Sequence, residues 1–224
     1  MPRGYVVVEG HGETDAVQNL LVRLWGDLGL SFATWAPPIR STRLHQETPF
    51  RKVCNLVRAK GDASMLLVLR DADLGDDCPR DRGPEAAAWM ESEKLPFPAA
   101  LTLFYKEYET LFLASLPSIV GKDWQDDHGN VRTGFPPDTR YSDDPQATRG
   151  VKEWLSKQLP SGRAYKPALD QLPLTRLLAF DLLRQTELPC FGTLERSLRF
   201  LATNMGKGGG VYPASSSARP LNMR

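Results

Sequence analysis

The chain has 224 residues, of which 41% are hydrophobic, and its formal net charge is +1. This content suffices for one cored domain with an elaboration, and the near-neutral charge excludes attraction of nucleic acid by a global field. No apolar run approaches the ~18 residues that span a membrane. Three cysteines without a Cys-x-x-Cys pair indicate neither a disulfide framework nor a zinc site. A strand begins within five residues and leaves no room for a signal peptide, so we expect reduced thiols and a cytoplasmic location.

The first seventy residues predict alternating strands and helices. We expect strands at 5–8, 31–35 and 65–69, and helices at 13–28 and from 48 to about 60. The two helices show apolar residues at helical spacing, and the first and third strands are continuous apolar runs typical of strands buried on both faces. This βαβαβ succession predicts right-handed crossovers and a parallel sheet.

The rest of the chain predicts one more strand, at 99–104, and helices at 84–93, 106–116, 151–158, 172–186 and 193–203. Residues 117–150 carry Gly, Pro and Asp throughout, which is compatible with a lid, an insertion or a disordered loop. The predicted fold class is therefore α/β, a mostly parallel sheet flanked by helices with a helical C-terminal elaboration.

The predicted organisation has three parts. An α/β core occupies 1–116, and a loop insertion with the helical elaboration occupies 117–203. The last segment, 204–224, has a Gly run and a Ser run without a core pattern, and this composition predicts a flexible tail.

Two acidic motifs follow the apolar strands. The first strand runs into Glu9, and the third runs into Asp71 and Asp73. In open α/β sheets the site lies beyond the carboxyl ends of the strands, so these carboxylates are expected to meet at one edge. Two unit charges about 4 Å apart repel by roughly 4 kcal/mol at an effective dielectric near 20. A divalent cation would offset this repulsion, and oxygen ligands favour Mg²⁺ or Mn²⁺.

This pair of motifs resembles the Toprim domain of topoisomerases, primases and OLD-type nucleases. Later segments extend the likeness to a bacterial family of small stand-alone Toprim-like proteins of unassigned function, over residues 4–203. These segments are Asp77-Cys78-Pro79, Glu107-Tyr108-Glu109, Tyr165-Lys166, Asp170-Gln171, Leu174-Thr175 and Phe191-Gly192-Thr193-Leu194-Glu195.

The resemblance implies roles for particular residues. Glu9, Asp71 and Asp73 would bind the catalytic metal, and Glu107 or Glu109 would hold a second ion. Lys166 would stabilise charge that develops on the scissile phosphate, so the catalytic residues would be Glu9, Asp71 and Lys166. Relatives of this kind act beside an SMC-like or ABC-type ATPase in bacterial anti-phage defence, and we expect such a partner here.

Each of these residues also has a simpler interpretation. Glu13 either faces the same site as a metal ligand or is a first-turn acid that interacts with the helix dipole. Asp71 or Asp73 could cap a helix, Glu107 and Glu109 could be solvated helix acids, and Lys166 could be a surface lysine. His11 is expected to be an exposed loop residue.

A basic cluster lies between the second and third predicted strands. Contacts with a nucleic-acid backbone and a solvated helix face are both open for it. The candidate nucleic-acid-binding residues are Arg40, Arg43, Arg51 and Lys52.

The function expected from these motifs is metal-dependent hydrolysis of nucleic-acid phosphodiesters, with DNA and RNA both open as substrate. One alternative is a non-catalytic subunit for binding or assembly that keeps the fold. Another is a small-molecule phosphatase, since Asp-x-Asp recurs in haloacid-dehalogenase-type enzymes, although there the motif follows the first strand. The absence of a Gly-x-x-x-x-Gly-Lys-Ser/Thr loop argues against a P-loop ATPase.

Overall fold

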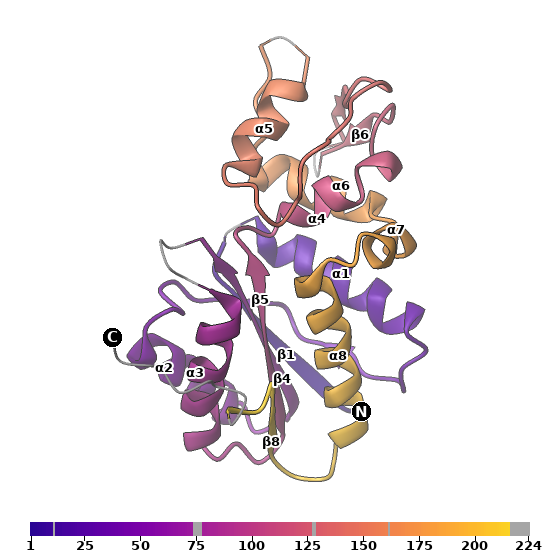
Figure 1. The fold of residues 1–224 in the computed structure, drawn as a ribbon. Helices are drawn as coiled ribbons and strands as arrows, with labels where there is room; N and C mark the ends of the chain where they lie inside the picture. Colours follow the sequence, from indigo (N-terminus) through magenta and orange to yellow (C-terminus); the bar gives the residue numbers. More distant parts are fainter. Residues whose placement is uncertain (11, 74–77, 127–128, 161, 216–224) are drawn as a thin grey trace, which may run out of the picture.

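The computed structural model describes residues 1–10, 12–73, 78–126, 129–160 and 162–215. His11, singled out in the sequence, lies outside the described residues. The centre is a six-stranded sheet in the order β2-β1-β4-β5-β8, with β3 also paired to β1, and every pairing in it is parallel (Figure 1). Its strands are β1 (Arg3–Val8), β2 (Thr34–Trp35), β3 (Ile39–Arg40), β4 (Ala63–Ala72), β5 (Pro98–Tyr105) and β8 (Gly210–Tyr212).

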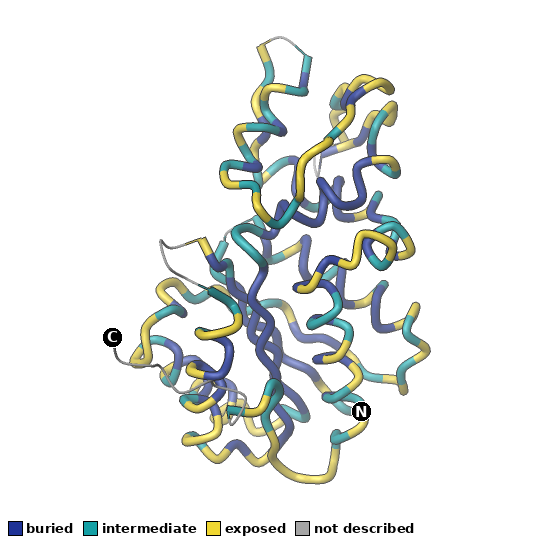
Figure 2. The backbone as a smooth tube through the Cα atoms, in the orientation of Figure 1, coloured by how far each residue is buried: buried dark blue, intermediate teal, exposed yellow. Residues whose placement is uncertain are grey.

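Helices cover both faces of this sheet. One face packs against α1 (Glu13–Asp27) and α8 (Pro189–Asn204), and the other against α2 (Glu47–Arg58) and α3 (Pro79–Ser92). Alternate residues of the strands enter the two cores: Val8 and Leu69 join the first, whereas Val7 and Val68 join the second. The central strands are buried on both sides (Figure 2). The predicted α/β class and parallel sheet are confirmed, because the apolar strand runs have two faces to bury.

A smaller helical part sits over the carboxyl ends of the strands (Figure 1). It packs onto the same core as α1 and α8, so the predicted elaboration shares the hydrophobic core of the sheet. Its elements are α4 (Thr110–Ala114), a 3₁₀ turn (Leu116–Ser118), a hairpin of β6 (Trp124–Gln125) and β7 (Val131–Arg132), α5 (Val151–Gln158), a π turn (Pro167–Gln171), α6 (Leu172–Leu177) and α7 (Phe180–Gln185).

Several predicted boundaries are wrong. The helix predicted from 193 begins at Pro189, and the strand predicted at 31–35 is only Thr34–Trp35. The single helix at 172–186 is two helices, because the chain is extended at Leu178 and Ala179. The helix predicted from 106 begins only at Thr110, so Glu107 precedes it and Glu109 is its N-cap. The helix predicted from 84 begins at Pro79 and contains Pro84.

The predicted flexible tail is wrong for its first part. Gly210–Tyr212 forms β8, which pairs with Pro98–Ala100 at the edge of the sheet. The Tyr212 ring lies 5.8 Å from that of Phe200 on α8, and Ser215 bonds Glu91 on α3. A strand of three residues is too short to show a recognisable alternation of apolar and polar residues in the sequence. Residues 216–224 lie outside the described part of the chain.

None of the helices in the described ranges combines the length and apolarity that crossing a bilayer needs.

Candidate functional site

The order of the strands defines where a site can form. From β1 the chain passes through α1 to β2 and β3 on one side of the sheet, and then through α2 to β4 on the other side of β1. The direction of winding therefore reverses between β1 and β4, and open α/β sheets bind ligands beyond the carboxyl ends of strands at such a switch point. Glu9 follows β1 there, and Asp71 lies at the end of β4.

The two faces of the sheet separate Glu9 from Asp71. Val7 pairs with Val68, so continuing this register by two residues brings Glu9 beside Arg70 on the α2 and α3 side. Asp71 is the next residue along β4 and therefore points to the α1 and α8 side. Glu9 and Asp71 therefore leave their strands toward different faces, but the charge of Glu9 still raises the pKa of Glu13, so Glu9 stays within electrostatic reach of the residues around Asp71.

Glu9 is held by the loop that precedes α2. The backbone N–H of Leu44 donates to Glu9 Oε1 at 2.8 Å, and Arg40 Nε lies 3.4 Å from the Glu9 carbonyl. Burial raises the pKa of Glu9, against the lowering effects of the Leu44 hydrogen bond, Arg70 and His45. Glu9 therefore links β1 to this loop.

Four other carboxylates gather on the opposite face and form what we call the carboxylate cluster: Glu13, Asp71, Glu107 and Glu109. Burial raises the pKa of every member. Repulsion from other members adds to it for Glu13, Asp71 and Glu109, and repulsion from Glu153 and Asp73 adds to it for Glu107. For Glu13, buried at the start of α1, the pKa reaches about 7. A helix dipole would have lowered this pKa. Burial therefore outweighs the helix dipole for Glu13, which is a first-turn acid of α1 and at the same time a member of the cluster.

Asp73 lies just beyond the cluster. It is exposed, and its carbonyl accepts a hydrogen bond from Arg149 Nη1 at 2.8 Å. Its charge still contributes to the raised pKa values of Asp71 and Glu107. Asp73 is thus close enough to influence the cluster, but it is not buried within it.

Lys152 is the residue of this site that sequence reasoning missed. It lies in the first turn of α5, and its Nζ is 3.4 Å from Glu109 Oε2 and 3.9 Å from Glu107 Oε2. Its charge lowers the pKa of all four carboxylates in the cluster. Helix 151–158 was predicted, but no sequence motif distinguishes this lysine from its neighbours.

Lys166, the predicted catalytic cation, is exposed, and its backbone N–H donates to Asp170 Oδ2 at 2.8 Å. No contact of its ammonium with the cluster is found among the described residues. The preceding residue reaches the cluster instead: the Tyr165 hydroxyl donates to Glu109 Oε1 at 2.9 Å. Of the pair Tyr165-Lys166, the tyrosine is therefore the one that contacts the cluster.

Two glycines allow the close packing around Glu13. The backbone of Gly10 hydrogen-bonds the Glu13 carboxylate, and a Cβ at Gly10 would lie 2.4 Å from Glu13 Oε1. A Cβ at Gly12 would lie 2.7 Å from the Pro167 carbonyl oxygen and 2.5 Å from Gln171 Oε1. Gly12 thus allows the start of α1 to lie against the π turn.

The oxygen atoms of the cluster are suitable ligands for a hard cation, but their positions are not. Asp71 Oδ1, Glu107 Oε2 and Glu109 Oε2 are buried and make no hydrogen bond, and carboxylate oxygens are the donors that Mg²⁺ and Mn²⁺ prefer. Among the described residues, however, no three His, Cys, Asp or Glu side chains are placed so that they could hold one ion. Lys152 supplies the positive charge in this arrangement.

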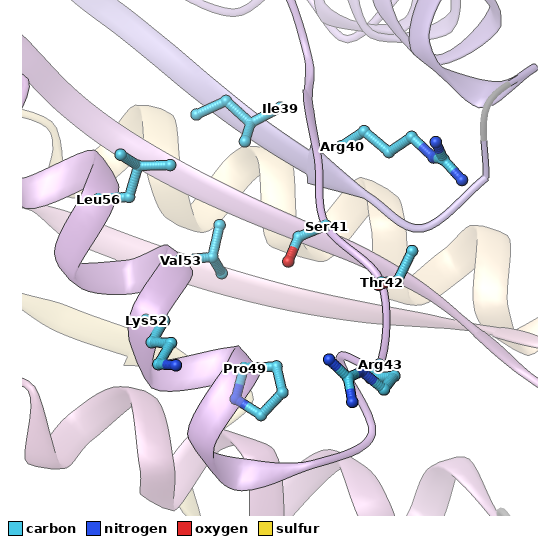
Figure 3. A pocket seen from close by; sticks show the side chains of 9 residues that line it. All are labelled: Ile39, Arg40, Ser41, Thr42, Arg43, Pro49, Lys52, Val53 and Leu56. Atoms are coloured by element: carbon cyan, nitrogen blue, oxygen red, sulfur yellow. The ribbon is translucent and has the colours of Figure 1, made fainter.

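A basic pocket lies on the Glu9 side. Arg40, Arg43 and Lys52 contribute to a hollow of about 520 Å³ between β3 and α2 (Figure 3). Its remaining lining residues are Ile39, Ser41, Thr42, Pro49, Val53 and Leu56. Arg51 does not line this pocket. Its guanidinium forms ion pairs with Glu47 at 2.7 Å and with Glu93 at 2.8 Å. The structure therefore brings together three of the four predicted nucleic-acid-binding residues.

Comparison of the chain with protein-family models, curated proteins and solved structures found no match in any of the three.

Proposed function

We propose that this protein is a Toprim-like, Mg²⁺- or Mn²⁺-dependent nuclease that hydrolyses nucleic-acid phosphodiester bonds. The observation that carries the proposal is the buried carboxylate cluster at the switch point of a parallel sheet. Clusters of carboxylates with strongly raised pKa values in such positions are characteristic of functional sites. Mutual repulsion of this kind is costly to keep in a fold without a role.

In this proposal the residues on the two faces of the sheet have different roles. Asp71, Glu13 and Glu109 would have to move onto one point to hold the metal, because no three side chains are placed for this among the described residues, and Glu107 and Asp73 would lie at its margin. When bound, the ion would polarise the phosphodiester and generate a nucleophilic water near neutral pH. Glu9 would position the loop 41–46 through its hydrogen bond to Leu44.

The basic pocket supports a polyanionic substrate. Arg40, Arg43 and Lys52 present positive charge next to the carboxyl end of β1, where phosphates of a backbone could be neutralised. The resemblance noted in the sequence adds the expectation of an SMC-like or ABC-type ATPase partner and of a role in anti-phage defence. Lys166, exposed near the π turn, would serve substrate or partner contacts.

One observation favours a second candidate function, a non-catalytic binding or assembly subunit. Lys152 already neutralises part of the cluster, and no three carboxylates converge on one point among the described residues. A site of this kind could keep the fold while the basic pocket binds nucleic acid.

Cleavage assays with purified protein, Mn²⁺ and plasmid, RNA or tRNA substrates separate the two candidates. The nuclease proposal expects cleavage by the wild type and a loss of at least tenfold in Asp71→Asn, equivalent to about 1.4 kcal/mol of transition-state stabilisation. Asp15→Asn, an exposed acid of α1, is the control and should retain activity. Near-normal activity in folded Asp71→Asn would refute the nuclease mechanism, and no cleavage of any substrate by the wild type would favour the binding subunit.

A further inference from the structure

The outer edge of β5 is only partly covered by a neighbouring strand. β8 pairs with Pro98–Ala100, and no strand among the described residues continues along Leu101–Tyr105 on that side. β8 is followed by Pro213, which has no N–H to donate to a ladder, and Ser215 is already bonded to α3. The carboxyl half of β5 is therefore an open strand edge.

This open edge lies in a hollow of about 800 Å³ between α3 and α8, the two helices that flank β5 (Figure 1). Leu101, Leu103 and Tyr105 line the hollow along β5, and Pro213 lines the end next to β8. Clefts of roughly 300–1,000 Å³ are typical of binding sites in proteins. The hollow is therefore large enough to hold a short segment of a partner.

Backbone groups of β5 face this hollow. Alternate residues of a strand direct their N–H and C=O groups to opposite edges. The backbone of Tyr105 hydrogen-bonds the thiol of Cys190 on α8, and its carbonyl accepts from Thr110 Oγ1 at 3.0 Å, so these groups point away from β4. Leu103, two residues earlier, shares that direction, and no partner strand reaches it at this edge in the described part of the chain. Such an edge is a template for an added strand.

The existing sheet fixes the direction of an added strand. Every pairing in it is parallel, so a strand that prolongs the line of β8 runs toward the carboxyl end of β5 and ends where α3 and α8 begin, at Pro79 and Pro189. Arg80 lines this end and makes no hydrogen bond or ion pair within the described ranges. Among the described lining residues, Arg80 and Arg196 outnumber the one acid, Asp81. The end of an added strand would thus meet a positive lining, which favours a carboxylate over an amino terminus.

We propose that this hollow binds the free C-terminal end of an extended peptide from a partner protein. The peptide adds a short parallel strand to β5, and its terminal carboxylate lies beside Arg80. From Leu101 to Tyr105 the open edge spans about 13 Å, at roughly 3.3 Å per residue, so only the last few residues of the partner are recognised. The inference is independent of the proposed function, because no lining residue of the hollow belongs to the carboxylate cluster or to the basic pocket.

A peptide array tests the proposal with the full-length protein. The array presents hexapeptides with free carboxyl ends and with every residue type at each of the last four positions, and a second array presents the same peptides as C-terminal amides. The strongest binder, measured in solution by fluorescence anisotropy, should bind at least tenfold more weakly as the amide. Absence of any binder, or equal binding of acid and amide, overturns the proposal.

Variants locate the binding in this hollow. Thr193→Trp fills it from the α8 side and should weaken binding of the free-acid peptide at least tenfold, and Arg80→Met should weaken it at least fivefold. Arg199→Met is the control, because Arg199 is an exposed arginine of α8 outside the lining, and its affinity should equal that of the wild type. Unchanged binding in both Thr193→Trp and Arg80→Met overturns the site.

Hydrogen exchange of the wild-type protein gives a measurement that does not depend on the folding of a variant. A bound strand should slow exchange of the Leu103 amide at least tenfold and leave the amides of the β6–β7 hairpin unaffected. Unchanged exchange at Leu103 with saturating peptide overturns the strand addition. Self-association of the protein that Thr193→Trp abolishes, without binding of any peptide, would assign the hollow to a second copy of the chain and likewise overturn the proposal.

Discussion

Burial of Glu13 couples the ionisation of one side chain to the stability of the whole fold. Its pKa is about 7 in the folded protein against an ordinary value of 4.5, so between these values the folded state binds more protons than the unfolded state. The free energy of unfolding therefore falls as the pH rises from about 4.5 to 7. This contribution is at most about 3 kcal/mol, at roughly 1.4 kcal/mol per pH unit.

The Glu13→Gln variant isolates that contribution. In metal-free buffer with EDTA, urea unfolding of the wild type should show lower stability at pH 7.5 than at pH 5. The change should be smaller in Glu13→Gln by up to about 3 kcal/mol, and Glu9, Asp71, Glu107 and Glu109 should keep the remainder, since burial raises their pKa values in the same direction. Asp15→Asn should behave as the wild type. If the free energy of unfolding changed equally with pH in the wild type and in Glu13→Gln, the pKa of Glu13 would be the same in the folded and unfolded protein.

At the scale of residues, the sequence identifies the acidic side chains at the strand ends but does not show which face of the sheet each of them takes. Strand ends and the parallel order were visible in the apolar runs, and these place Glu9 and Asp71 correctly along the chain. Which face each carboxylate takes depends on the strand register, which emerges from packing. Lys152 and Tyr165 enter the site through contacts with residues more than forty positions away, and no local pattern encodes such contacts.

At the scale of elements, the start of α1 depends on close contact with the π turn. Alanine at Gly12 would place its Cβ 2.7 Å from a backbone carbonyl of Pro167, which cannot move without displacing the turn. We expect Gly12→Ala to lose about 1–3 kcal/mol of stability. Gly26→Ala, within the same helix and with open space around the new Cβ, should gain up to about 1 kcal/mol. Urea unfolding of both variants provides the comparison, and equal effects would contradict the packing argument.

The strand β8 gives the C-terminal region a structural role that its composition did not reveal. Removing residues 209–224 takes away the pairing with Pro98–Ala100 and the contact between Tyr212 and Phe200. We expect a loss of about 1–2 kcal/mol, which lowers the melting temperature by roughly 2–8 °C for a chain of this length. Tyr212→Ala should account for part of this loss. An unchanged melting temperature in the truncated protein would restore the view of the whole segment as an undocked tail.

The elements that were predicted well are those with long periodic patterns. β1, β4 and β5 and helices α1 and α2 have enough apolar residues at regular spacing to specify both type and position. The break between α6 and α7 lacks a glycine or proline at the turn itself. At the break, Arg23 of α1 donates hydrogen bonds to the carbonyl oxygens of Thr175 and Leu178. These bonds satisfy carbonyl groups that the end of α6 leaves without a partner within the helix. A tertiary bond of this kind has no local sequence signal.

At the scale of the whole molecule, the net charge of +1 limits how nucleic acid can bind. If the proposed function holds, attraction would come from the basic pocket, and only a few phosphates would be neutralised. The affinity for duplex DNA should then fall with salt with a slope of roughly −2 to −3 in a plot of log K against log salt, because each phosphate contact contributes about −0.9. A strongly basic binding protein would show a much steeper dependence.

Two variants determine whether the basic pocket causes this slope. Replacing both Arg43 and Lys52 by alanine removes two phosphate contacts and should reduce the magnitude of the slope by about 2. Arg51→Ala is the matched control, because Arg51 lies on the same helix but is bound to Glu47 and Glu93. Its slope should equal that of the wild type. Fluorescence anisotropy with a labelled duplex over a series of salt concentrations measures all three proteins. A reduced slope in Arg51→Ala, with no change in the double variant, would move the nucleic-acid contact from the pocket to the exposed surface of α2.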